Sequence, residues 1–176
     1  MARRLAFERF DQAELRLCRY LNRSSSSTLV RQLFRGISWL GDGWVWYGLL
    51  LALPLIYGPQ GGRAAAHMGL TAFVGVVIYK LVKTRAVRER PYITHSVIQC
   101  ASVPLDRYSF PSGHTLHAVS FAWQVTAHFP ELGWVLVPLA ALIAAARVVL
   151  GLHYPTDVLA GAAIGASLAA LGTSLA

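Results

Sequence analysis

Two histidines and one aspartate supply the groups with which this chain could carry out nucleophilic or acid–base chemistry. His153 lies four residues before Asp157, across a turn that contains Pro155. A carboxylate at this spacing can hold one ring nitrogen as a donor and leave the other free as nucleophile or base. His114 opens a long apolar segment and could protonate a departing oxygen. We therefore predict His153, Asp157 and His114 as catalytic residues.

Basic residues outnumber carboxylates around these three side chains, which favours a ligand with several negative charges. The forked guanidinium of arginine matches phosphate oxygens, and lysine supplies a point charge. A helix that begins at Ser112 and Gly113 would add backbone N–H groups and the positive end of its dipole. The predicted phosphate-binding residues are Lys83, Arg90, Ser112, Gly113 and Arg147.

The sequence offers no pattern for binding a metal. Its two cysteines, Cys18 and Cys100, lack metal-ligand spacing, and no cluster of carboxylates accompanies the histidines. We predict no metal and no cofactor. Phosphoryl transfer through a phosphohistidine is the chemistry that these residues favour.

The elements that must position these residues are apolar helices. Of the 176 residues, 55% are hydrophobic and 14% are charged, whereas soluble domains carry roughly 25% charged residues. A spanning helix needs about 20 predominantly apolar residues. Five segments reach or approach that length, at about 40–58, 64–82, 112–129, 132–150 and 155–175. The pattern predicts an all-α polytopic transmembrane bundle of five to six spans.

The first 39 residues differ from the rest. In residues 7–21 and 29–37, apolar residues form a stripe on one helical face and arginines lie on the opposite face. This pattern predicts two amphipathic helices lying on the membrane interface. Eight of the sixteen basic residues are arginines before residue 36. Beside a membrane these favour lipid headgroups rather than nucleic acid. We divide the chain into an N-terminal amphipathic region (1–39) and a transmembrane catalytic domain (40–176).

Counting the crossings predicts which ends share a side of the membrane. The second segment ends, and the third begins, at the long polar connection of residues 84–111, and the fourth returns after the turn at 129–133. Three polar stretches are therefore expected at one membrane face: Lys83–Pro91, Ser112–His114 and Arg147–Asp157.

These stretches resemble the three signature motifs of the type-2 phosphatidic acid phosphatase superfamily. The first motif reads "KTRAVRERP" from Lys83 to Pro91, and the second reads "PSGH" from Pro111 to His114. The third reads "ARVVLGLHYPTD" and ends at Asp157. The resemblance covers roughly residues 40–175. Each motif alone is a weak signal, whereas the order and spacing of all three are specific.

The resemblance implies roles that coincide with those argued from chemistry. His153 would attack phosphorus, Asp157 would orient it, and His114 would protonate the leaving group. Lys83, Arg90, Ser112, Gly113 and Arg147 would hold the phosphate. One position departs from the pattern: Ala146 replaces the serine of the third motif, which removes a hydroxyl from the expected phosphate pocket or its surroundings.

The expected function is a membrane lipid phosphatase that hydrolyses a lipid phosphomonoester or diphosphate. Phosphatidate, phosphatidylglycerol phosphate and a polyprenyl diphosphate are the candidate substrates, with the bilayer as the surrounding partner. Two alternatives stay open: a lipid phosphotransferase that uses the same intermediate, and a non-enzymatic membrane protein that binds anions. Mere binding does not need the set of two histidines and an aspartate.

Two features of the sequence disagree about the side of the membrane on which the site lies. The resemblance implies the outer face of a bacterial-type inner membrane. With five spans, the arginine-rich N-terminus would share that face, against the tendency of basic segments to stay in the cytoplasm. Either the N-terminal region adds a sixth, partly inserted helix, or the site faces the cytoplasm. We expect the outer face.

Overall fold

A computed structural model describes residues 2–104 and 106–174, with side chains described from residue 11 onward. Its helices are α1 (Ala2–Arg23), α2 (Thr28–Trp39), α3 (Val45–Arg85), α4 (Pro91–Thr94), α5 (Gly113–His128), α6 (Gly133–Val149) and α7 (Pro155–Ser174). Two short 3-10 turns, η1 (Ser24–Ser26) and η3 (Pro130–Leu132), and a π-helical segment, η2 (Leu40–Trp44), connect them. The described chain is therefore all-α in its regular structure.

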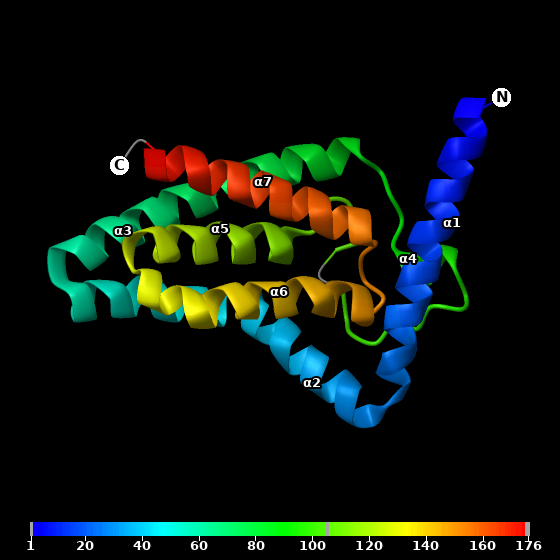
Figure 1. Cartoon of the computed structure of the whole chain (residues 1–176), viewed down its shortest axis with the longest axis horizontal. Helices are drawn as coiled ribbons and strands as arrows, with labels where there is room; N and C mark the ends of the chain where they lie inside the picture. Colours follow the sequence, from blue (N-terminus) through cyan, green and yellow to red (C-terminus); the bar gives the residue numbers. More distant parts are fainter. Residues whose placement is uncertain (1, 105, 175–176) are drawn as a thin grey trace.

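The bundle is built around α5, which lies between α3, α6 and α7 (Figure 1). Helix α3 turns back on itself at Gly58, where φ is 56° and Pro59 follows. Small residues set the closest contact: a Cβ atom at Gly161 would lie 2.4 Å from the Ser112 carbonyl oxygen, and one at Gly165 would lie 2.3 Å from that of Leu116. Glycine thus lets α7 approach the backbone of α5, as small residues do between membrane helices.

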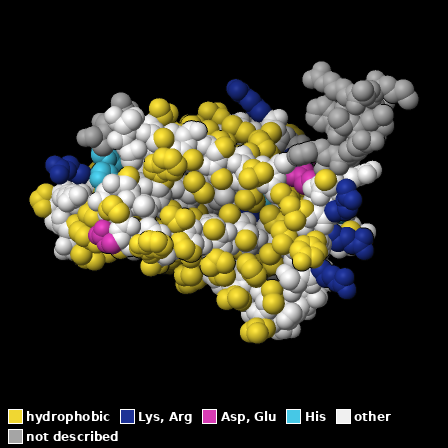
Figure 2. All heavy atoms as spheres, in the orientation of Figure 1, with side chains coloured by type: hydrophobic (Ala, Val, Ile, Leu, Met, Phe, Trp, Pro, Cys, Tyr) yellow, Lys and Arg dark blue, Asp and Glu magenta, His cyan; other side chains and the backbone are white. Residues whose placement is uncertain are grey.

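Three stretches of the described chain are long and apolar enough to cross a membrane: Thr28–Arg85, Pro130–Val149 and Pro155–Ser174. Their outward side chains are hydrophobic, with Leu55 86% and Trp134 87% exposed. Figure 2 shows hydrophobic side chains spread over the visible face of the bundle, whereas Lys and Arg lie toward its edges. The chain is an all-α membrane protein. The finer count of five to six crossings stays a prediction.

The N-terminal region is attached to the end of the bundle by buried polar contacts. Helix α1 lies crosswise at that end (Figure 1). Asn22 donates to the carbonyl oxygens of Gln99 (3.0 Å) and Val149 (2.9 Å), and it accepts from the Gln99 N–H (2.8 Å). Helix α2 continues through η2 into α3, so the predicted boundary at residues 39–40 falls within a continuous helical run. The division into two regions stays a prediction.

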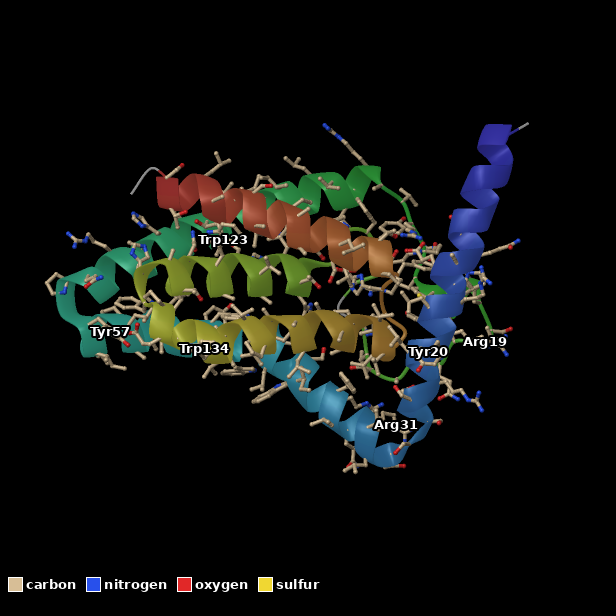
Figure 3. The ribbon with its side chains drawn as sticks, in the orientation of Figure 1. Arg19, Tyr20, Arg31, Tyr57, Trp123 and Trp134 are labelled. Carbon is tan, nitrogen blue, oxygen red and sulfur yellow. The ribbon has the colours of Figure 1, made fainter. Side chains whose placement is uncertain are left out.

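The opposite end of the bundle holds the bend of α3 and the turn between α5 and α6. Tyr57 stacks on Phe129 with ring centroids 3.9 Å apart, and its hydroxyl donates to Glu131 at 3.0 Å. In Figure 3, Tyr57 and Trp134 lie at this end, and Arg19, Tyr20 and Arg31 lie at the other. We call these two regions the far end and the site end.

Candidate active site

The three motif-bearing stretches meet at the site end, next to the crosswise α1 (Figure 1). The Ser112 N–H donates to the Asp157 carbonyl oxygen at 3.0 Å, which ties the start of α5 to the start of α7. The Ser109 N–H donates to the Arg88 carbonyl oxygen at 2.8 Å, which ties the polar loop to the chain after α3. The expected convergence of these stretches is therefore present in the structure.

His153 is buried in the loop between α6 and α7, with its two ring nitrogens in different surroundings. Its Nε2 lies 3.2 Å from Nη1 of Arg90. Its Nδ1 has no hydrogen-bond partner in the part of the chain that the structure describes, and it lies 3.8 Å from Oδ2 of Asp157. Burial, and then the positive charges of Arg147 and Arg90, hold the pKa of His153 well below its ordinary value. A neutral imidazole with one nitrogen toward the cations can act as a nucleophile.

Asp157 is fully buried and held by partners on both of its oxygens. Oδ2 accepts from the Tyr154 N–H at 2.8 Å, and Oδ1 accepts from Nη1 of Arg88 at 2.8 Å. The guanidinium of Arg88 also lies over the Tyr154 ring, 3.8 Å from its centroid. These contacts fix the carboxylate on the Nδ1 side of His153, where a small movement would complete a hydrogen bond.

Lys83 and Arg90 both bind the carboxylate of Asp106, a residue that was not predicted from the sequence to belong to the site. Asp106 accepts from Nζ of Lys83 at 2.6 Å, from the Tyr79 hydroxyl at 2.5 Å and from Nη2 of Arg90 at 2.7 Å. Burial alone would raise the pKa of Asp106, but hydrogen bonds from Lys83, Tyr79 and Arg90 lower it to about 2. Asp106 is therefore ionised at neutral pH and forms ion pairs with two cations that could otherwise bind a phosphate.

His114, the residue predicted to protonate the leaving group, lies at the start of α5 beside side chains from two other helical segments. Its Nε2 forms a short hydrogen bond with Oδ1 of Asp42 in η2. Arg147 of α6 is buried and donates from Nη1 to the Ser38 hydroxyl, while its Nε has no partner among the described residues. Arg147 thus keeps an unused donor near the site.

Three positions have surroundings that differ from those expected. The Ser112 hydroxyl lies 2.9 Å from that of Thr115 and caps α5, so it is turned into the helix. A Cβ atom at Gly113 would lie 3.0 Å from the Tyr79 ring, which makes a protein contact the reason for glycine there. Ala146 is fully buried in an apolar cluster with Leu150 and Leu152.

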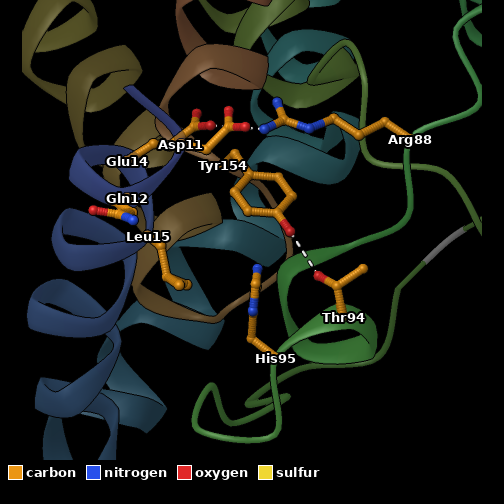
Figure 4. Close-up of a pocket in the computed structure, with 8 residues that line it drawn as sticks. All are labelled: Asp11, Gln12, Glu14, Leu15, Arg88, Thr94, His95 and Tyr154. Carbon is orange, nitrogen blue, oxygen red and sulfur yellow. Dashed lines mark hydrogen bonds and ion pairs between the residues drawn. The ribbon is translucent and has the colours of Figure 1, made fainter. Parts of the chain in front are cut away.

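Helix α1 reaches this region through Glu14. Its carboxylate accepts from Nη2 of Arg88 at 2.7 Å and from the Thr156 N–H at 2.8 Å. Figure 4 shows this contact at the edge of a pocket of about 540 Å³ that lies between α1 and the segment around Thr94 and His95. Arg88 consequently bridges α1 to Asp157.

Two cavities share Asp42, the hydrogen-bond partner of His114, as a lining residue. The first, about 410 Å³, is polar and is lined by Arg35, Ser38, Trp39, Asp42, Ser102, Val103 and Arg147. The second, about 160 Å³, is mainly apolar and runs between the two halves of α3 and α5, where Trp46, Leu50, Val76 and Phe121 line it. A charged headgroup and a hydrocarbon chain could therefore occupy adjoining spaces.

Sequence reasoning missed Glu14, Asp42 and Asp106 and gave Arg88 no definite role. Asp42 carried a usable signal, because it is the one charged residue between 36 and 62 and an ionisable group at membrane depth is a functional candidate by default. The partners of Glu14 and Asp106 become visible only when α1 and the loop are placed in space. Among the described residues, no group of three or more His, Cys, Asp or Glu side chains could hold a metal ion.

Comparison with known proteins identifies the family. The family model of the PAP2 superfamily matches residues 64–176. The decaprenylphosphoryl-5-phosphoribose phosphatase of Mycobacterium tuberculosis is 36% identical over 145 residues, which are 80% of this chain and 77% of the relative. Undecaprenyl-diphosphatase BcrC of Bacillus subtilis is 32% identical over 111 residues, or 63% of this chain; the match spans only 57% of BcrC.

A solved structure gives the fold. The transmembrane PAP2-type phosphatidylglycerolphosphate phosphatase of Bacillus subtilis superposes with a TM-score of 0.78, covering 94% of this chain and 85% of that one at 22% sequence identity. At that identity the likeness concerns the arrangement of the helices. Together with the match over residues 64–176, these findings show that the chain belongs to the PAP2 superfamily of membrane lipid phosphatases.

Proposed function

We propose that this chain hydrolyses a lipid phosphomonoester or diphosphate through a phosphohistidine at His153. The observation that carries the proposal is the placement of His153, whose Nε2 faces Arg90 while Nδ1 faces Asp157. Nε2 attacks phosphorus and forms an N–P bond as the P–O bond to the lipid breaks. His114 gives its proton to the departing oxygen. Water then attacks the phosphohistidine and gives a proton back to His114, which breaks the N–P bond, releases inorganic phosphate and restores both imidazoles.

The surrounding cations supply electrostatic stabilisation of the transferred group. Lys83 and Arg90 already bind a carboxylate, Asp106, in a geometry that phosphate oxygens could take over. Arg147 contributes a charge and the unused Nε donor from α6. The Gly113 end of α5 adds the positive end of a helix dipole, whereas the Ser112 hydroxyl acts by capping that helix.

We place the phosphate at His153, between Arg90 and Arg147, on the side where Arg147 lines the polar cavity, and we place the first lipid carbons in the apolar cavity. Asp42 lines both cavities, so they adjoin at the depth of His114. The names of two relatives specify polyprenyl carriers, one undecaprenyl and one decaprenyl. A polyprenyl chain carrying a phosphate or diphosphate is therefore the substrate class that we favour over a glycerophospholipid.

Phosphate release in detergent tests this function. We would assay undecaprenyl diphosphate, phosphatidate and phosphatidylglycerol phosphate with the wild type, His153→Ala and Glu131→Gln, each with and without EDTA. We expect wild-type and Glu131→Gln activity in EDTA and none above background in His153→Ala. Full activity of His153→Ala would remove the assigned nucleophile. Loss of wild-type activity in EDTA would remove the metal-independent mechanism.

We further propose that the site faces the outer side of a bacterial-type inner membrane. A native reporter exists: Cys100 is exposed in the polar loop at the site end, whereas Cys18 is buried. An impermeant maleimide should label the wild type but not Cys100→Ser in intact cells. Labelling that appears only after the cells are permeabilised would place the site end in the cytoplasm.

A further inference from the structure

Asp42 is a charged residue inside an otherwise uncharged stretch of the first apolar segment, residues 36–62. Its side chain is 34% exposed, and its Oδ1 is hydrogen-bonded to Nε2 of His114, whose side chain is 10% exposed. A carboxylate at this depth is costly unless it is paired. Its partner is His114, which acts as the general acid in the proposed function.

The backbone around Asp42 is shaped for this contact. The chain kinks within residues 40–44, between α2 and α3, and Gly43 at the kink has a φ of 128° that favours glycine. At Gly41 a Cβ atom would lie 2.9 Å from Cγ2 of Ile143 and 3.4 Å from Cδ2 of His114. The absence of a side chain at residue 41 therefore lets the chain come close enough for Asp42 to reach the imidazole.

We propose that Asp42 is the positioning residue of His114: its carboxylate holds Nε2 and turns the imidazole so that Nδ1 faces the leaving oxygen. With Nε2 held by Asp42, Nδ1 is the nitrogen that can donate. The two histidines of the site would then each face an aspartate, Asp157 for His153 and Asp42 for His114.

The position of Asp42 fits the bond that must break. The leaving oxygen joins the phosphate to the lipid, so it belongs at the boundary between the polar and the apolar cavity. Asp42 lines both cavities, and His117, one turn after His114, lines the apolar one. An acid held by Asp42 is therefore placed at the oxygen on which its proton is needed.

This inference rests on the proposed function, and a leaving-group comparison separates the two. Undecaprenyl phosphate must expel a poorly stabilised alkoxide, whereas p-nitrophenyl phosphate expels a stable phenolate that needs little protonation. We would measure kcat for both substrates with the wild type, Asp42→Asn, Asp42→Glu, His114→Ala and Glu131→Gln. Glu131→Gln serves as the control because Glu131 is a carboxylate that accepts a hydrogen bond at the far end.

For Asp42→Asn we expect kcat on undecaprenyl phosphate to fall roughly tenfold to a hundredfold and kcat on p-nitrophenyl phosphate to fall about threefold or less, since general acid catalysis contributes about 10²–10⁴-fold. His114→Ala should show the same selectivity more strongly, and Asp42→Glu should recover part of the activity on undecaprenyl phosphate. Equal losses of Asp42→Asn on both substrates, or no loss, overturn the role of Asp42. An unselective His114→Ala overturns the acid assignment itself.

Discussion

The two ends of the bundle carry similar residue types but pair them differently. At the far end, the His67 and His128 rings lie 5.9 Å apart, and Glu131 accepts one hydrogen bond, from Tyr57. At the site end, the carboxylates of Glu14, Asp106 and Asp157 each bind an arginine, and Asp106 also binds a lysine. Polar residues at a membrane end are thus common to both, whereas interlocked ion pairs around a buried histidine belong to the site end.

The largest expected difference between the ends comes from Asp157. Replacing it by asparagine removes the negative charge that lies beside Nδ1 of His153 and pairs with Arg88. Misorientation of a catalytic histidine in this way costs on the order of 10²–10⁴-fold in kcat. Steady-state phosphate release measures the loss. A fall smaller than about threefold would mean that Asp157 only locks the turn between α6 and α7.

A smaller effect is expected from Glu14, which extends the network into α1. Glu14→Gln leaves a hydrogen-bonding side chain but removes the charge paired with Arg88, and losing a buried partner costs about 1–3 kcal/mol. The thermal midpoint in detergent should fall, with kcat reduced several-fold. Asp11→Asn is the matched control, because Asp11 lines the same pocket on the same helix. Equal effects of both variants would contradict a specific Glu14–Arg88 link.

Asp106 should affect ligand affinity more than the chemical step. Asp106→Asn removes the charge that occupies Lys83 and Arg90, so a phosphate no longer competes with a carboxylate. We expect inorganic phosphate to inhibit the variant several-fold more tightly, the scale of a single partly exposed ion pair worth about 1 kcal/mol. Inhibition constants measure this effect. Weaker inhibition would show that Asp106 organises the cations for phosphate instead of competing with it.

The far end should be the least sensitive. Glu131→Gln and Tyr57→Phe each remove part of one exposed hydrogen bond, and surface changes of this kind alter stability by about 0.5 kcal/mol or less. The turnover of any lipid phosphate should stay within about twofold of the wild type by the same measure. A large loss of activity would remove the contrast between the ends and indicate coupling through the length of α5 and α6.

Much of the site end could be predicted because its residues stand in motifs on segments whose crossings can be counted. Lys83 and Arg90 both bind Asp106, and Arg90 also contacts His153, so the three predicted residues lie together as expected. Helix length and alternating direction are enough to bring the ends of three segments to one face. No contact between side chains was needed for that step.

The remaining contacts depend on tertiary placement. Glu14 lies on an amphipathic helix whose angle to the bundle the sequence does not specify, and it meets Arg88 and Thr156 only because α1 crosses the site end. Asp106 follows from the path of an irregular loop. The Ser112 hydroxyl had two physically reasonable partners, a phosphate or its own helix, and in the structure it caps the helix.

The measurement that tests the central claim most directly is the chemical trapping of the intermediate. Enzyme mixed with a ³²P-labelled lipid phosphate and quenched in alkali should carry a base-stable, acid-labile label, and peptide mass spectrometry should locate it at His153. The label should be absent from His153→Ala and should accumulate in wild type before steady-state release. Turnover without any protein-bound label, or a label on a residue other than His153, would contradict the account.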